Sequence, residues 1–199
     1  MRVLVVGASG TIGRAIVAEL EPRHEVITAG RSSGELRTDI TDSAAIRTMF
    51  EEAGSIDAVV SATGKVKFAP FESMGTEDYE IGLKDKLMGQ VNLVLIGRDF
   101  ISDGGSFTLT TGVLDSEPIR QGTSASMVNG AINAFVTAAA IEMPRGQRIN
   151  VVSPGVIEEA MEVYGPFFRG FEPVPAARAA LAYAKSVEGA HTGRVYRVR

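Results

Sequence analysis

The sequence contains no cysteine among its 199 residues. Disulfide bonds, thiolate nucleophiles and cysteine-ligated metal sites are therefore excluded, although this absence does not fix the cellular compartment. Basic residues form no run and the formal net charge is -4, which argues against a nucleic-acid-binding surface. The aspartates Asp57, Asp103 and Asp115 do not have the spacing of a metal site, so we expect no metal.

Long hydrophobic runs are absent as well. No stretch approaches the roughly 18 uninterrupted apolar residues of a membrane-spanning helix. The first apolar run has only four residues, too few for the apolar region of a signal peptide. Hydrophobic residues nevertheless make up 45% of the chain and charged residues 22%, which allows a sizeable core. We expect one soluble, cytoplasmic domain over residues 1–199, bound to no membrane and no nucleic acid.

The beginning of the chain carries the strongest motif. Residues 2–6 form a β-branched apolar run typical of a strand buried on both faces. The glycine-rich segment GASGTIG follows, and residues 14–20 then have helical spacing. Glycines let the backbone approach a pyrophosphate closely, and the free N–H groups at a helix start favour its charge. This strand–turn–helix predicts a dinucleotide site that includes Gly7, Ser9, Gly10, Thr11, Ile12 and Gly13.

The second strand indicates which dinucleotide binds. Residues 25–29 are strand-like and lead into Gly30, Arg31 and Ser32. NAD sites normally carry a carboxylate here for the ribose 2′-hydroxyl, whereas a guanidinium flanked by hydroxyls suits a 2′-phosphate. We therefore predict NADP as the cofactor, with a solvated loop arginine as the alternative.

Strand-like and helix-like segments alternate to the end of the chain, which predicts a doubly wound parallel sheet covered by helices on both faces. Expected strands lie near 35–38 and at 56–61, 105–110, 147–152 and 193–198. Expected helices span 43–53, 77–100, 124–143 and 174–186, and residues 156–172 have the composition of a lid. Because cofactor-binding ends of such strands share one edge of the sheet, the segments that follow each strand should line one cleft.

The motifs together resemble the short-chain dehydrogenase/reductase family over nearly the whole chain. The resemblance rests on the glycine turn, on the pair Asp39 and Ile40, and on Pro154 and Gly155. Two further segments stand where the family has known motifs. Ser61-Ala62-Thr63-Gly64 stands in place of Asn-Asn-Ala-Gly, and Thr123-Ser-Ala-Ser-Met127 in place of Tyr-Ser-Ala-Ser-Lys. The resemblance implies a Rossmann-like three-layer α/β fold with about seven mostly parallel strands. It also implies that Asp39 and Ile40 contact adenine, that Ser61 to Gly64 line the cofactor, and that Pro154, Gly155 and Ile157 close the nicotinamide side. A small-molecule carbonyl or alcohol would be the substrate.

The departures from the family concern its catalytic residues. Members use a tyrosine proton donor and a lysine four residues further on, which fall here at Thr123 and Met127. The chain has no tyrosine between Tyr79 and Tyr164, so no shift of the alignment restores one. The pKa of a threonine hydroxyl lies far above the tyrosine value of about 10, so Thr123 is a poor general acid.

Other residues are candidates for the missing functions. Lys86 falls near the family's asparagine position, and a buried lysine with a lowered pKa is a plausible acid. Thr110 is expected to steady the carbonyl in place of a serine, and Thr123 to hydrogen-bond the ligand. The alternatives are a solvated Lys86, and Tyr164 as the proton donor.

Three functions stay open at this point. The first is an NADP-dependent oxidoreductase with a rebuilt active site, and the second is an inactive protein that senses or binds NADP(H). The third is a site for another adenine ligand such as an S-adenosyl donor. The presence of Arg31, Pro154 and Gly155 argues against this third function. The expected helix 124–143 has Glu142 as its only charge, and such an apolar surface predicts a homodimer or homotetramer.

Overall fold

The computed structural model describes all residues from 1 to 199. A single seven-stranded sheet, with the order β3-β2-β1-β4-β5-β6-β7 and every pair parallel, forms its centre. The strands are β1 (Arg2–Val6), β2 (Glu25–Gly30), β3 (Leu36–Arg37), β4 (Ile56–Ser61), β5 (Ile101–Thr110), β6 (Arg148–Pro154) and β7 (Val195–Val198). The predicted α/β class and doubly wound parallel sheet are confirmed.

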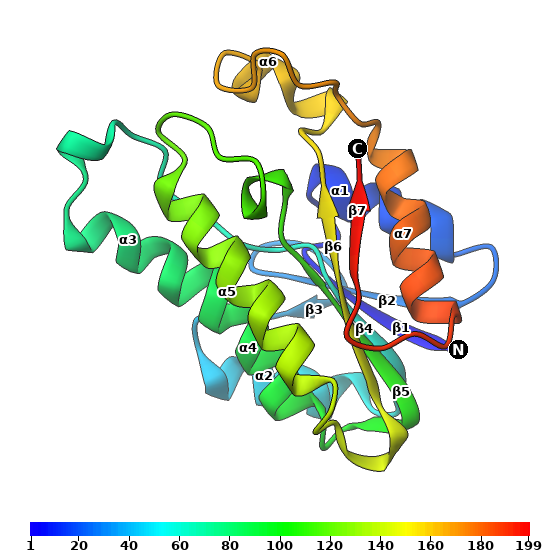
Figure 1. Cartoon of the computed structure of the whole chain (residues 1–199). Coiled ribbons are helices and arrows are strands. Elements are labelled where there is room, and N and C mark those ends of the chain that lie inside the picture. Colours follow the sequence, from blue (N-terminus) through cyan, green and yellow to red (C-terminus); the bar gives the residue numbers. More distant parts are fainter.

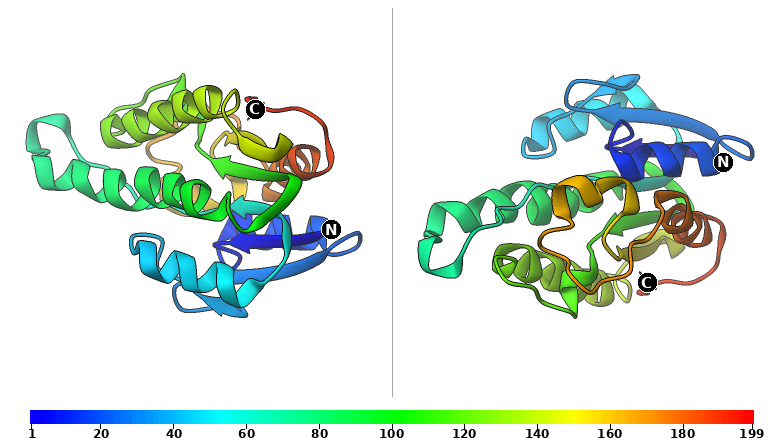
Figure 2. Two further views of the ribbon diagram at one scale, coloured as in Figure 1. Left: turned by 90° about the horizontal axis from the view of Figure 1, so that it is seen from below. Right: turned by 90° about the horizontal axis from the view of Figure 1, so that it is seen from above.

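Helices cover both faces of this sheet (Figures 1 and 2). On one face lie α2 (Ser43–Ala53), α4 (Gly89–Gly97) and α5 (Thr123–Ala139); on the other lie α1 (Thr11–Leu20) and α7 (Ala176–Glu188). Two apolar cores result. The larger packs Phe50, Leu93 and Ile132 against Phe107, and the smaller packs Ile16 and other side chains of α1 and α7 against Val5 and Val60.

The order of the strands locates a ligand crevice. From β1 the chain proceeds outward to β2 and β3, then returns to β4 on the other side of β1 and continues outward to β7. Val6 is paired with both Ala29 and Ser61, so β1, β2 and β4 end at the same level. In open α/β sheets, ligands bind beyond the carboxyl ends of the strands at such a reversal.

Residues 77–100, predicted as one helical region, consist of three parts. These are α3 (Thr76–Gly82), a π-helical segment (Leu83–Met88) and α4. Behind the π-helical segment, Gly89 lets the helix approach Ile40 so closely that a Cβ there would lie 2.6 Å from Ile40 Cδ1. Single π turns inside helices often occur at functional sites because they re-aim the side chains that follow.

Residues 156–172 lie above the carboxyl ends of β6 and β7 and include the short helix α6 (Met161–Tyr164). Phe168 and Val156 of this segment pack with Leu114 and Ala125 in a small separate core. The helices of the molecule are all too short or too polar to cross a bilayer.

Candidate functional site

The glycine turn between β1 and α1 has the geometry of a phosphate cradle. Gly7 has φ +86 and donates its N–H to the carbonyl of Ala29 at 2.8 Å. A Cβ on Gly7 would lie 2.5 Å from the Ala62 oxygen, so β4 closes in from the other side. Gly10 is the N-cap of α1 and no side chain caps the helix. The first N–H groups of α1 are therefore free to bind an anion.

A groove runs along this edge of the sheet as two cavities. The first, of about 330 Å³, lies beside the ends of β2 and β3; the second, of about 470 Å³, lies between α5 and the segment around α6. Both are lined by Gly10, Ala62 and Gly64, so together they form one continuous groove. Their combined volume falls within the usual range of small-ligand sites, about 300–1,000 Å³.

Most of the predicted cofactor residues line this groove. The first cavity is lined by Gly7, Ser9, Arg31, Ser32, Ile40 and Thr63, and the second by Thr11, Ile12, Pro154, Gly155 and Ile157. Three predicted residues do not line it. Gly13 packs beneath the turn, where a Cβ would collide with the Gly7 carbonyl, and Ser61 is fully buried with its hydroxyl 2.8 Å from that of Thr63.

Asp39 is the third of these residues, and its side chain is fixed within its own loop. Its carboxylate accepts hydrogen bonds from the backbone N–H and the hydroxyl of Thr41, at 2.9 and 2.7 Å. These bonds, with a smaller contribution from Arg31, lower the pKa of Asp39. Asp39 therefore holds its own loop, while its neighbours Thr38 and Ile40 face the cavity.

Arg31 reaches the first cavity from the end of β2. Its Nη2 lies 3.1 Å from Asp39 Oδ1 and 3.4 Å from Asp85 Oδ2. The side chain is half exposed, so these pairs are screened and hold it only weakly. Lys65 and Asp85 line the same cavity, so this end of the groove carries charges of both signs.

Thr110 does not face the groove, which corrects its predicted role. Side chains alternate along β5: Phe107 and Leu109 enter the larger core, whereas Thr110 points toward α7. There its hydroxyl lies 2.7 Å from the Tyr183 hydroxyl, and burial raises the pKa of that tyrosine. Thr111, the next residue, lines the second cavity instead.

The predicted contact of Thr123 with the ligand is not what the structure has. The positions of α5 that line the second cavity are Ala125 and Asn129, which are four apart and share one helix face. Thr123 lies outside the cavity with its hydroxyl 2.8 Å from that of Tyr79, and Met127 is exposed on the outer surface. The face of α5 that meets the cavity therefore carries neither a tyrosine nor a lysine.

Lys86 extends from the π-helical segment into the second cavity. Its aliphatic stem packs against Gly64, and its ammonium donates a hydrogen bond to the Thr111 carbonyl at 3.3 Å. Burial lowers the pKa of Lys86 to about 8, and no charged partner contributes. An amine with such a pKa can give and take a proton near neutral pH. Tyr164 also lines the cavity, with its ring 5.9 Å from that of Phe68.

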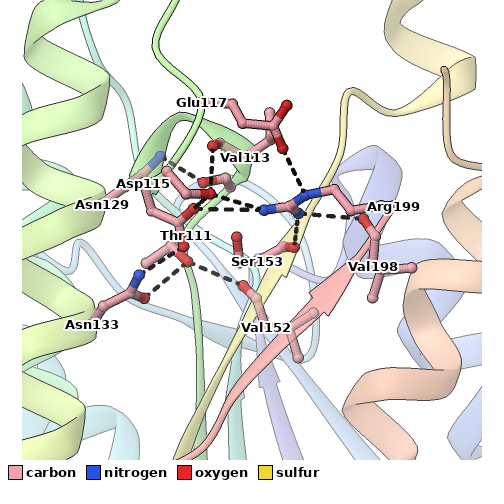
Figure 3. Close-up of polar contacts among 12 residues, drawn as sticks. Thr111, Val113, Asp115, Glu117, Asn129, Asn133, Val152, Ser153, Val198 and Arg199 are labelled. Carbon is pink, nitrogen blue, oxygen red and sulfur yellow. Dashed lines mark hydrogen bonds and ion pairs between the residues drawn. The ribbon is translucent and has the colours of Figure 1, made fainter. Parts of the chain in front are cut away.

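Thr111 is held from behind by a polar network (Figure 3). Its hydroxyl donates to Asn133 Oδ1 at 3.3 Å, and Asn133 Nδ2 donates to Asp115 Oδ2 at 2.7 Å. The side chain of Asp115 is fully buried and lies 3.6 Å from the guanidinium of Arg199. Arg199 also donates to the Ser153 carbonyl at 2.7 Å. The ends of β5, β6 and β7 are thereby joined behind the cavity.

Two buried oxygens in the groove lack hydrogen-bond partners. They are Thr38 Oγ1 in the first cavity and Asn129 Oδ1 in the second, on residues only 5% and 2% exposed. Buried polar atoms are nearly always hydrogen-bonded in folded proteins, so unpaired ones facing a cavity indicate a ligand that satisfies them. One unpaired acceptor in each half fits an elongated ligand rich in hydroxyl and amino groups.

Comparisons with known proteins agree with this geometry. The sequence model of the family described as Enoyl-(Acyl carrier protein) reductase matches residues 9–191. This chain belongs to the short-chain dehydrogenase/reductase family. Galactitol 2-dehydrogenase of Agrobacterium fabrum is 27% identical over 193 residues, covering 87% of this chain and 73% of its own length. Hydroxynaphthalene reductase arp2 of Aspergillus fumigatus is 25% identical over 182 residues, covering 79% and 67%.

Solved structures of similar proteins share the whole short-chain dehydrogenase/reductase architecture. The protein lin1944 from Listeria innocua is 53% identical, with a TM-score of 0.98 over 100% of both chains. A small-chain dehydrogenase in complex with NADPH is 24% identical, with a TM-score of 0.88 over 100% of this chain and 96% of its own. The named relatives are dehydrogenases and reductases, and the present chain is an oxidoreductase of this family.

Sequence reasoning missed several residues of the groove. Thr38 precedes the predicted adenine pair, and Asn129 lies within a helix whose small residues offered no polar signal. The Asp115–Arg199 pair joins two positions that lie far apart in the sequence. No local sequence pattern reveals such a pair. In the structure no three His, Asp or Glu side chains come together as a metal site.

Proposed function

We propose that this chain is an NADP-dependent oxidoreductase that acts on a carbonyl or alcohol substrate through an altered active site. The observation that carries the proposal is the Lys86 ammonium, which lies in the second cavity of a nucleotide-shaped groove beside Thr111. A proton donor at the chemical end of such a groove suits hydride-transfer chemistry.

The residues of the groove fit NADP(H). The free N–H groups at the start of α1 would hold the pyrophosphate, and Arg31, with Ser32 and Lys65 beside it, would hold the 2′-phosphate. The unpaired oxygens of Thr38 and Asn129 would accept hydrogen bonds from the two nucleoside halves. The NADPH complex of a structurally similar dehydrogenase supports this choice of cofactor.

The cofactor and the protein would supply different parts of the chemistry. When bound, the nicotinamide of NADP(H) supplies or accepts a hydride. In the reductive direction, Lys86 Nζ donates a hydrogen bond and then a proton to the substrate oxygen as negative charge develops there. In the oxidative direction the neutral amine accepts that proton. Thr111 lines the cavity in place of Thr110, and its hydroxyl, whose proton goes to Asn133, would accept a hydrogen bond from a substrate hydroxyl.

The second candidate is a protein that binds or senses NADP(H) without turnover. The observation that favours it is the cavity-facing face of α5, where Ala125 and Asn129 offer neither a tyrosine nor a lysine. Ala125 has no ionisable group, and the Asn129 amide cannot assist a proton transfer as an ammonium does.

One experiment separates the two functions. NADPH oxidation is measured with a panel of aldehydes, ketones and quinones for the wild type and for the double variant Ala125→Tyr with Asn129→Lys. Turnover by the wild type supports the enzyme. If the wild type binds NADPH without turnover and the double variant turns over, the binding protein is the correct function.

The assembly we propose is a homodimer or homotetramer formed through α5. Its outward face presents Met127, Ala134 and Ala138, and Leu95 is exposed on the neighbouring helix α4. Neither helix carries a charged residue. Apolar surface of this kind is usually covered by a partner, and small side chains allow two helices to approach closely.

A further inference from the structure

The second cavity has an uneven distribution of charge. Lys86 is the only charged residue that lines it. Most of the remaining wall is apolar, with Val66, Phe68, Leu114 and Phe168 among its side chains. A cation in such surroundings has lost much of its hydration and gains strongly from a negative partner.

No group of the protein supplies that partner. The adjacent carboxylate, Asp85, points to the other side of the segment, where it accepts from the Lys65 N–H at 2.8 Å and pairs with Arg31. Helices α4 and α5, which pack against the π-helical segment, carry no ionisable residue, and Tyr79 of α3 is bonded to Thr123. Glu80 of α3 pairs with Lys84, which is 72% exposed.

The ammonium also has unused hydrogen-bonding capacity. Of its three N–H donors, one reaches the Thr111 carbonyl, at a long 3.3 Å. Two donors are therefore left open within a largely apolar enclosure, which is the arrangement of a polar anchor in a ligand site.

We propose that the substrate is an anion: a molecule with an apolar body that carries a carboxylate beside the reacting carbonyl or alcohol, with Lys86 as its counter-ion. This inference rests on the proposed function, because it names the substrate class of the same site. A carboxylate would restore the charge balance of the cavity and occupy one of the two free donors of Lys86, which leaves the other for the reacting oxygen. The lowered pKa of Lys86 supports the inference, since the folded chain alone does not stabilise its charge.

The test uses benzoate and benzamide, two flat molecules of nearly equal shape that differ in charge. Both are titrated calorimetrically into the protein with and without NADP⁺. At pH 7, benzoate should bind at least about tenfold more tightly than benzamide, as expected for a charge-assisted contact. The preference should fall as pH rises above about 8, because Lys86 then loses its proton. Near pH 8.5, benzoate binding should take up protons, measured in buffers of different ionisation enthalpy.

Two variants complete the design. Lys86→Met should abolish both the preference for benzoate and the proton uptake, whereas Lys84→Met, which removes an exposed cation of the same segment, should change neither. The pH series on the wild type remains decisive if Lys86→Met fails to fold. Equal or undetectable binding of the two probes overturns the inference, and so does a preference that persists in Lys86→Met.

The inference and the proposed function fail in different ways. A protein that selects benzoate but binds no NADP(H) refutes the proposed function and leaves the anion site in place. Conversely, if Lys86→Met weakens NADP⁺ binding as much as benzoate binding, the ammonium serves the cofactor and the anionic substrate is refuted.

Discussion

In the proposed reaction, Lys86 is the residue that sets the pH dependence. Burial holds its pKa at about 8, so its ammonium form predominates below that value and its neutral form above it. Carbonyl reduction needs the proton, so its kcat/KM should fall as pH rises through about 8, while that of alcohol oxidation should increase over the same range. Rates measured from pH 6 to 10 test this. Reduction that accelerates above pH 8 would exclude Lys86 as the proton donor.

Arg31 is the residue on which the proposed preference for NADP depends. Charge-assisted hydrogen bonds contribute about 1.5–3 kcal/mol, so NADPH should bind roughly tenfold or more tightly than NADH. Arg31→Ala should remove this preference and leave NADH affinity nearly unchanged, because the side chain lies at the 2′ end of the groove. Fluorescence titration of NADPH and NADH into the wild type and into Arg31→Ala measures these affinities. Equal affinities in the wild type, or a preference that survives the substitution, would contradict the assignment.

At the scale of the elements, the buried Asp115 joins α5 to the ends of β5 and β7. It accepts from Asn133 and from the Ser116 hydroxyl, each at 2.7 Å, and pairs with Arg199. Asp115→Ala should lower the free energy of unfolding by about 1–3 kcal/mol, because buried polar partners lose their acceptor. Glu117→Ala removes the exposed partner of the same arginine and should cost at most about 0.5 kcal/mol. Urea unfolding of both variants compares them, and equal losses would refute the role of burial.

The helices and strands could largely be predicted because their patterns are local. The buried run before Gly7, the helix after it and the alternation that follows all depend on short-range periodicity. The π-helical segment could not be predicted, because it arises where the helix packs closely on Ile40, far away in sequence.

The catalytic end of the site was harder to predict for the same reason. Thr110 and Thr111 are identical residues in adjacent positions, and only the pleat of β5 decides which one faces the groove. On α5, the resemblance of Thr123–Met127 to the family motif did not indicate that Ala125 and Asn129 are the positions that line the cavity. The helix face that meets the cavity depends on tertiary packing, which a sequence of alanines and serines does not encode.

At the scale of the whole molecule, we expect a dimer or tetramer at micromolar concentration. Met127 and Ala134 lie on the outer face of α5, and an added charge there would be buried at the interface. Ala134→Glu should therefore shift the protein toward the monomer in sedimentation experiments. Glu21→Lys, at the exposed end of α1, serves as the control and should leave the assembly intact. A monomeric wild type would contradict the proposed interface.

The central claim is that Lys86 performs the proton chemistry of an NADP-dependent oxidoreductase. Its most direct test is the rate of NADPH oxidation at pH 7 by wild type and Lys86→Met, at saturating NADPH and with the best substrate of the carbonyl panel. Removal of such a donor typically costs about a hundredfold or more in rate. The account predicts that loss together with an NADPH affinity close to that of the wild type. An unchanged rate in Lys86→Met would contradict it.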